Sequence, residues 1–167
     1  MLIRTEAPAD ILAVDRLLKK TFATEQEANL VMSLRENSNL TLALVACNDE
    51  GDVVGYAMFS PVSIGGEEGY WQGLAPIAVD PEYQGQGIGQ QLVEQGIEFL
   101  ADFSYPGCVV LGAPGFYARF GFHNAQELGL SCRWSTEPGA LQVREIIEGA
   151  LNGLSGSVEY SAEFSAF

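Results

Sequence analysis

A short polar stretch over residues 84–89 has the composition of an anion-binding loop. Gln84-Gly85-Gln86-Gly87-Ile88-Gly89 contains three glycines and comes directly before a segment with helical periodicity. A helix start presents unpaired N–H groups and partial positive charge, and glycines let a bulky anion approach them closely. One interpretation is therefore a phosphate or pyrophosphate site, and the other is a tight turn between a strand and a helix.

The spacing of these glycines argues against two common nucleotide-binding patterns. The dinucleotide pattern G-x-G-x-x-G would need a third glycine where Gln90 stands. The Walker-type pattern needs a lysine, and no Lys or Arg occurs between Arg35 and Arg119. A phosphate bound here would depend on backbone N–H groups and on the helix start. A different class of nucleotide-binding enzyme is therefore disfavoured.

The second candidate stretch is Gly-Ala-Pro-Gly-Phe-Tyr-Ala-Arg-Phe-Gly-Phe over residues 112–122. A short helix started by Pro114 would place Phe116 and Phe120 on one face. For the phenylalanines an aromatic core cluster is the simpler interpretation. Tyr117 differs because its hydroxyl can donate a proton and needs a polar partner when it is buried.

The secondary structure that must position these residues is predicted to be that of an α/β (α+β) protein. Strands are predicted over residues 2–6, 40–47, 53–62, 70–79, 108–111 and 140–147, and the last stretch, 156–167, has a strand-like segment over 157–160 that would add an edge to the sheet. Helices are predicted over 8–22, 25–36 and 88–100, with a short one from 114. The strands over 70–79 and 108–111 should be parallel because a whole helix joins them. In the second helix we expect Ala28, Val31, Met32 and Leu34 inward and Glu25, Glu27, Arg35 and Glu36 outward.

Composition limits the class of protein and its partners. The 167 residues are 47% hydrophobic, which predicts one domain over residues 1–167 with a full core. No apolar run of about 18 residues and no secretory leader pattern occurs, so we expect a cytoplasmic protein. The net charge of −14 argues against nucleic acid or a membrane as partner. Cys47, Cys108 and Cys132 lack metal-ligand spacing, so we expect buried thiols and no metal.

Both candidate stretches resemble signatures of one enzyme family. Gln84-x-x-Gly87-x-Gly89 after an apolar strand resembles the acetyl-coenzyme A loop of the GNAT superfamily of N-acetyltransferases. Residues 115–122 resemble its second signature, F-Y-x-[KR]-x-G-F, and Tyr117 lies 28 residues after Gly89. The order of elements and several short motifs look like the YhbS-type group of predicted bacterial acetyltransferases. The resemblance implies a GNAT fold, with a mixed central sheet of about six to seven strands and helices on both faces.

The resemblance also implies an activity and a role for particular residues. The activity is direct transfer of an acetyl group from acetyl-coenzyme A to a primary amine, either a small molecule or a protein amino group. Tyr117 would protonate the departing coenzyme A thiolate. Arg119 is the nearest basic residue in sequence that could reach a coenzyme phosphate. Backbone groups would contact the pantetheine arm and the pyrophosphate, and the residues implied are Ile77, Ala78, Val79, Gln84, Gly85, Gln86, Gly87, Ile88, Gly89 and Gly112.

Two departures from the family leave questions open. Gly112 and Ala113 stand where many relatives have an asparagine that binds pantetheine. The strand before the loop also lacks the glutamate that often serves as general base, so the candidates are water, Glu25, Glu27, Glu67, Glu68 and His123. A GNAT domain that binds acyl-coenzyme A as a sensor without catalysis is the alternative function. The acceptor, the acyl length and the oligomeric state, a homodimer included, stay open.

Overall fold

The computed structural model describes residues 1–134 and 136–167, which fall into two compact parts. The first part comprises Met1–Phe59, Ala75–Gly96 and Glu163–Phe167, and the second comprises Ser60–Leu74 and Ile97–Ala162. Both parts contain residues of β3 (Val53–Ile64), β4 (Gln72–Val79) and α3 (Ile88–Asp102). A single domain over residues 1–167 stays a prediction.

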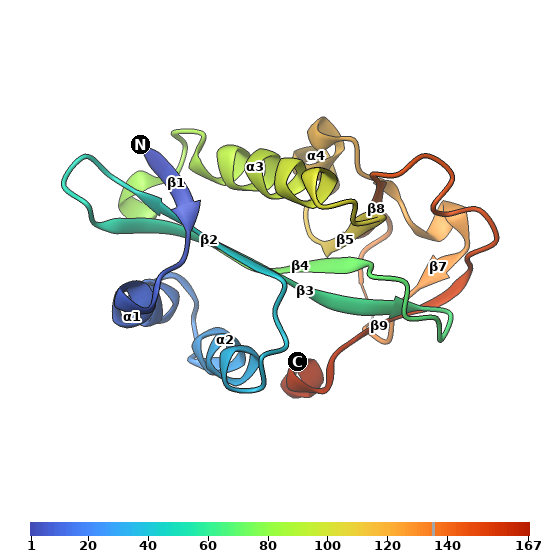
Figure 1. The fold of residues 1–167 in the computed structure, drawn as a ribbon, viewed down its shortest axis with the longest axis horizontal. Coiled ribbons are helices and arrows are strands. Elements are labelled where there is room, and N and C mark those ends of the chain that lie inside the picture. The colour runs from blue at the N-terminus through green and yellow to red at the C-terminus, as the bar shows by residue number, and fades with distance from the viewer. Residues whose placement is uncertain (135) are drawn as a thin grey trace. The chain divides into compact units, whose positions relative to one another are not determined.

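The first part is a layer of strands covered by helices on both faces. Its strand order is β1 (Leu2–Thr5), β2 (Leu42–Cys47), β3 and β4, and the first two pairs are antiparallel. Figure 1 shows α1 (Ile11–Thr21) and α2 (Gln26–Glu36) on one face of these strands and the start of α3 on the other. Every residue of β2 is buried, as expected for a strand covered on both faces.

The buried face of α2 differs from the predicted one. Leu30 is buried together with Ala28, Val31 and Leu34, whereas Met32 is 45% exposed, so the inward prediction for Met32 is wrong. A residue directly after Val31 is turned by about 100° around the helix, which carries Met32 off the buried stripe. The outward prediction for Arg35 is also wrong, because its side chain is only 15% exposed and forms an ion pair with Glu6.

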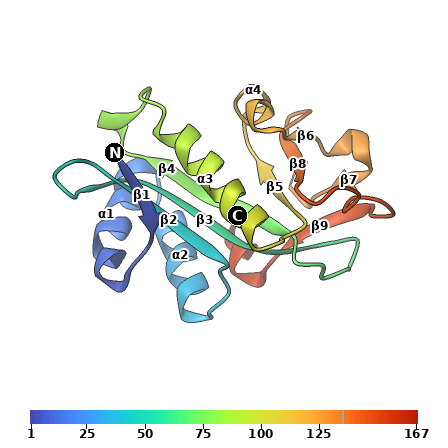
Figure 2. The same ribbon diagram turned by 45° about the horizontal axis from the view of Figure 1, so that its top comes forward.

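The second part is a mixed sheet of mostly short strands. β4 pairs in parallel with β5 (Gly107–Leu111), through Gln72 with Cys108 and Gly73 with Val109, so the predicted parallel pairing is confirmed. β5 pairs antiparallel with β8 (Leu141–Glu145), which also pairs with β6 (His123–Asn124). β9 (Gly156–Tyr160) pairs antiparallel with β3 and parallel with β7 (Leu130–Ser131). Figure 2 shows α4 (Pro114–Tyr117) directly after the end of β5.

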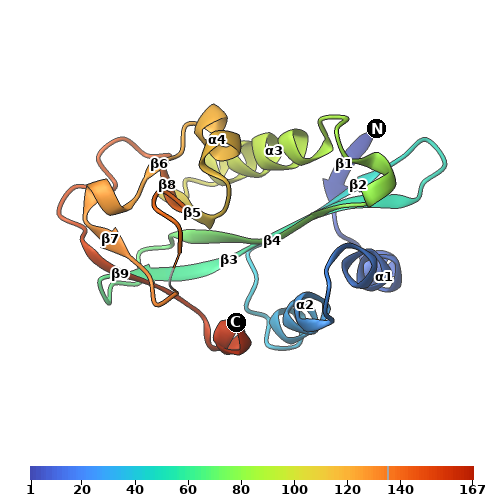
Figure 3. The ribbon, with the colours of Figure 1, turned by 180° about the vertical axis from the view of Figure 1, so that it is seen from behind.

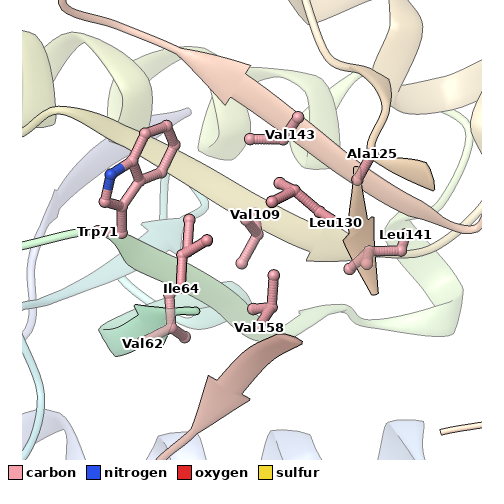
Figure 4. Packing of buried hydrophobic residues seen from close by; sticks show 9 residues of the cluster. All are labelled: Val62, Ile64, Trp71, Val109, Ala125, Leu130, Leu141, Val143 and Val158. Carbon is pink, nitrogen blue, oxygen red and sulfur yellow. The ribbon is translucent and has the colours of Figure 1, made fainter. Parts of the chain in front are cut away.

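An apolar core holds the strands of the second part together. Figure 4 shows its nine buried side chains, which come from β3, β5, β7, β8, β9 and the segments beside β4 and β6: Val62, Ile64, Trp71, Val109, Ala125, Leu130, Leu141, Val143 and Val158. β5 is therefore fixed by packing just before the chain turns into α4.

The remaining sequence expectations concern cysteines, metals and membranes. Cys47 and Cys108 are buried as predicted, whereas Cys132 is only partly buried. Burial raises the pKa of the Cys108 thiol well above its ordinary value. Across residues 1–134 and 136–167 there is no cluster of three or more His, Cys, Asp or Glu suited to a metal ion. Over the same residues, no helix is both long enough and apolar enough to span a membrane.

Candidate functional site

The end of β4 offers a strand edge to a ligand. In the first part β4 is the last strand of the order β1-β2-β3-β4, so among the residues described there the far edge of Ala75–Val79 has no partner strand. Pro76 has no N–H to donate, which is typical of an edge position. Ile77 and Val79 are half-buried and Ala78 is buried. An extended ligand can add to such an edge through backbone hydrogen bonds.

A capped turn connects this strand to the glycine loop. The carboxylate of Asp80 accepts a hydrogen bond from the Glu82 N–H at 3.0 Å and so caps the 3-10 helix Pro81–Tyr83. The Asp80 N–H donates to the Val54 carbonyl at 2.8 Å, and Asn48 donates to the Tyr83 hydroxyl at 3.1 Å. The turn is therefore fixed to β3 and to the hairpin between β2 and β3.

Lys20 on α1 adds a charged contact to the same turn. Its Nζ lies 3.0 Å from Asp80 Oδ2 and 3.4 Å from Glu82 Oε2. Burial alone would raise the pKa of the Asp80 carboxyl, but hydrogen bonds from the Glu82 N–H and from Lys20 lower it overall. The local sequence gives no sign of this contact because 60 positions separate Lys20 from Asp80. Lys20 thus brings a basic side chain to the turn before the loop, and the loop motif does not include this residue.

The glycine loop has a backbone suited to an anion. Gly85 and Gly87 have φ angles of 79° and 84°, in the left-handed region, where residues other than glycine are strained. A Cβ at either position would meet nothing within 4 Å, so the space in front of the backbone is open. The first regular helical bond of α3 runs from the Gln91 N–H to the Gly87 carbonyl at 3.1 Å. The preceding N–H groups of the helix start therefore lie at the loop.

Side chains around the loop divide into anchors and exposed groups. Ile88 is 2% exposed and anchors the first turn of α3 in the core, which leaves its backbone as the predicted contact. Gln84 Nε2 donates to the Val79 carbonyl at 3.0 Å, so two predicted coenzyme contacts are bonded to each other. Gln86 is exposed. The loop is thus tied to the end of β4 before any ligand binds.

Tyr117 is a buried phenol at the end of α4. The residue is 6% exposed, and the rings of Phe116 and Phe122 pack edge-on against it at 4.9 and 5.7 Å between centroids. Burial, with a smaller contribution from the neighbouring Cys108 thiol, raises the pKa of Tyr117 to about 12. The hydroxyl is therefore fully protonated near neutral pH and can act as a proton donor.

Gly112 makes room for the Tyr117 ring. A Cβ at Gly112 would overlap Cε2 of Tyr117, so any larger residue would displace that ring. The Gly112 N–H donates to the Ala140 carbonyl at 3.0 Å, and its own carbonyl accepts from Gln142 Nε2 at 3.5 Å. The predicted contact of Gly112 with pantetheine stays a prediction, and the structure gives this glycine a second role beside Tyr117.

Arg119 lies on the exposed surface just after α4. Its guanidinium stacks over Phe116 and Phe120, at 4.9 and 5.5 Å from the ring centroids, and its Nε donates to the Phe116 carbonyl at 3.4 Å. Arg119 is exposed, so its guanidinium is accessible to a ligand. Its contact with a coenzyme phosphate stays a prediction.

The structure singles out none of the five side chains predicted as general base. Glu25 is exposed and Glu27 is half-buried, both beside the start of α2 in the first part. In the second part the other three candidates are exposed: Glu67, Glu68 and His123. A base therefore stays unassigned, and water is still among the candidates.

The chain is similar to known acetyltransferases along its whole length. A family model described as acetyltransferase (GNAT) domain matches residues 39–124. The uncharacterized N-acetyltransferase YhbS of Escherichia coli (strain K12) is 48% identical over 167 residues, which is all of both chains. A crystal structure of YhbS from Escherichia coli in complex with CoA has a TM-score of 0.95, with 99% of this chain and 92% of that chain covered. A GNAT acetyltransferase from Brucella melitensis in complex with acetyl-CoA has a TM-score of 0.82 at 34% identity, over 98% and 97% of the two chains.

Proposed function

Because the chain belongs to the GNAT acetyltransferase family, as its two motifs predicted, we propose that it transfers an acetyl group from acetyl-coenzyme A to a primary amine. The mixed sheet and its helices match solved GNAT structures. The acceptor would be a small-molecule amine or an amino group of a protein. A homodimer stays open, and no partner of another class is proposed.

The observation that carries the catalytic proposal is the buried, protonated phenol of Tyr117. Its raised pKa keeps the proton on the hydroxyl, and Gly112 gives the ring a close fit. A domain that only sensed acyl-coenzyme A would not need a proton donor held in this way. Retention of this residue and of its packing therefore favours an enzyme over a sensor.

The residues of the loop fit the coenzyme's diphosphate. Gly85 and Gly87 have left-handed φ angles with open space beside them, and the start of α3 adds unpaired N–H groups and a partial positive charge. Gln84, Gln86, Ile88 and Gly89 would complete the loop through their backbones. Ile77, Ala78 and Val79 would pair with the pantetheine arm at the free edge of β4 and help to polarise the acetyl carbonyl.

The proposed reaction is a direct displacement at the thioester. The neutral acceptor amine attacks the acetyl carbonyl, a C–N bond forms and the C–S bond breaks. Tyr117 gives its proton to the sulfur as that bond breaks, which avoids release of a bare thiolate with an ordinary pKa of about 8.5. The amine loses its extra proton to water or to a side chain not yet identified. Tyr117 then regains a proton from solvent.

Two measurements test the proposal in sequence. Calorimetric titration with acetyl-coenzyme A is expected to show one binding site per chain. Release of free thiol is then measured with a panel of primary amines, from polyamines to peptides with free N-termini, and acetylated product is identified by mass. Binding without thiol release from any amine would favour the acyl-coenzyme A sensor. Absence of binding would contradict both functions.

A further inference from the structure

We propose that Lys20 is a positioning residue for coenzyme binding, which acts through the carboxylates of Asp80 and Glu82. In this role Lys20 fixes the turn that leads into the glycine loop and cancels negative charge beside it. The inference rests on the proposed function, because it concerns the same coenzyme site. Neither the loop motif nor the Tyr117 motif contains this residue.

The contact joins α1 to the turn directly before the loop. Asp80 has a side chain only 12% exposed, and its two oxygens have different partners. Oδ1 accepts from the Glu82 N–H inside the turn, and Oδ2 accepts from Lys20. Asp80 also donates its N–H to the Val54 carbonyl, so its backbone is held by β3 while its carboxylate links the turn to α1.

The charges around the turn explain why a cation is needed there. Asp80 and Glu82 place two carboxylates on the turn that leads directly into the loop, and a diphosphate bound at the loop would bring more negative charge next to this turn. Like charges held close together raise the free energy of the bound complex. Lys20 contacts both carboxylates, and its hydrogen bond to Asp80 raises the pKa of its ammonium group, so it stays charged.

The neighbouring lysine on the same helix provides a matched control. Lys19 forms an ion pair with Asp15 at 2.9 Å, one turn away on α1, and its side chain is 44% exposed against 48% for Lys20. Lys19→Met and Lys20→Met therefore remove the same charge from adjacent positions with similar exposure. The two lysines differ in their partners. Lys19 pairs with Asp15 on its own helix, whereas Lys20 pairs with carboxylates of the turn before the loop.

The experiment is calorimetric titration of coenzyme A into the wild-type chain and three variants, Lys20→Met, Lys20→Arg and Lys19→Met. It is run at low and at high salt, about 0.05 M and about 0.5 M. At low salt we expect Lys20→Met to bind about fivefold more weakly than the wild type and Lys19→Met to match the wild type. Lys20→Arg keeps the charge, so its affinity should return to within about twofold. At high salt the deficit of Lys20→Met should shrink, because salt screens the unpaired carboxylates.

The outcomes separate this inference from the proposed function. A wild-type chain that does not bind coenzyme A overturns both. Wild-type binding with equal affinities for Lys20→Met and Lys19→Met overturns the role of Lys20 alone. A deficit in Lys20→Met that is independent of salt and is not rescued in Lys20→Arg would indicate general damage to the fold, and it also overturns this role.

Discussion

The glycine loop and the Tyr117 helix would serve the same reaction with opposite kinds of chemical group. The loop is exposed and offers backbone N–H groups, which any residue compatible with its φ angles would supply. The helix offers a single buried hydroxyl, which depends on the packing around one ring. The loop should therefore tolerate changes of side chain but not of backbone shape. The contribution of the helix to catalysis should be lost when the Tyr117 hydroxyl oxygen alone is removed.

Removal of the Tyr117 hydroxyl should have the largest effect on activity. In Tyr117→Phe we expect turnover to fall by about 100-fold to 10,000-fold, which is the usual contribution of a general acid. Affinity for acetyl-coenzyme A should stay within about twofold of the wild type, because the loop is intact. Steady-state thiol release and calorimetry measure the two quantities. Unchanged turnover would remove Tyr117 from the role of acid.

A methyl group at Gly112 should damage catalysis by displacing the same ring. Gly112→Ala places a Cβ against Tyr117, and a displacement of about 1 Å at a reacting group can cost about 100-fold in turnover. Gly115→Ala is the matched control, because its added Cβ meets nothing within 4 Å and Gly115 has no left-handed φ. Equal turnover in the two variants would show that the fit of Tyr117 against Gly112 has no catalytic importance.

A change of backbone shape in the loop should affect binding and spare the chemical step. Gly87→Ala puts an alanine in a left-handed conformation that costs about 1–2 kcal/mol, so the ligand-free loop should relax to another shape. Because coenzyme A would need the original shape, we expect its affinity to fall about tenfold. Turnover at saturating acetyl-coenzyme A should change little. Gly153→Ala carries a similar strain at φ 79° with open space around it, but it lies away from the loop in sequence. If the two variants lose affinity equally, the effect is one of general stability.

Loss of Arg119 should have the smallest effect of the four changes. Its guanidinium is exposed and stacked on two aromatic rings, and one exposed charge contact with a phosphate typically contributes less than 1 kcal/mol. We expect Arg119→Ala to weaken coenzyme A binding about threefold. Arg133→Ala is the control, since Arg133 also stacks on a ring, that of Trp134 at 4.6 Å. An unaltered affinity in Arg119→Ala would reject the phosphate contact.

Local patterns in the sequence were enough to predict most of the secondary structure around the candidate site. The apolar run before Asp80, the glycines and the periodicity after them predict a strand, a turn and a helix, which are β4, the 3-10 turn with its loop, and α3. The short helix at Pro114 and the parallel pairing of β4 with β5 were predicted as well. Each of these features depends on neighbouring residues or on the length of one connection.

Features that depend on contacts between distant segments were not predicted. Lys20 meets Asp80 across 60 positions, and Arg35 meets Glu6 and lies near the buried Tyr56 hydroxyl. A helical pattern assigns charged residues to the outer face by default, and only the folded chain shows which of them find a buried partner. The inward prediction for Met32 was wrong for a related reason, because the width of an apolar stripe on a helix does not fix the exact centre of its buried face.

The contacts that fix the turn before the loop also have a consequence for the entropy of binding. Asp80, Tyr83 and Gln84 are each held by a hydrogen bond to a different element, so most of the approach to the loop is ordered before a ligand arrives. Only residues 85–87 would then lose conformational freedom on binding, and preorganisation of this kind raises affinity without adding a contact. Amide hydrogen exchange of the ligand-free protein should accordingly show protection of the Asp80, Glu82 and Tyr83 amides, which have hydrogen-bond acceptors, and fast exchange over residues 85–87.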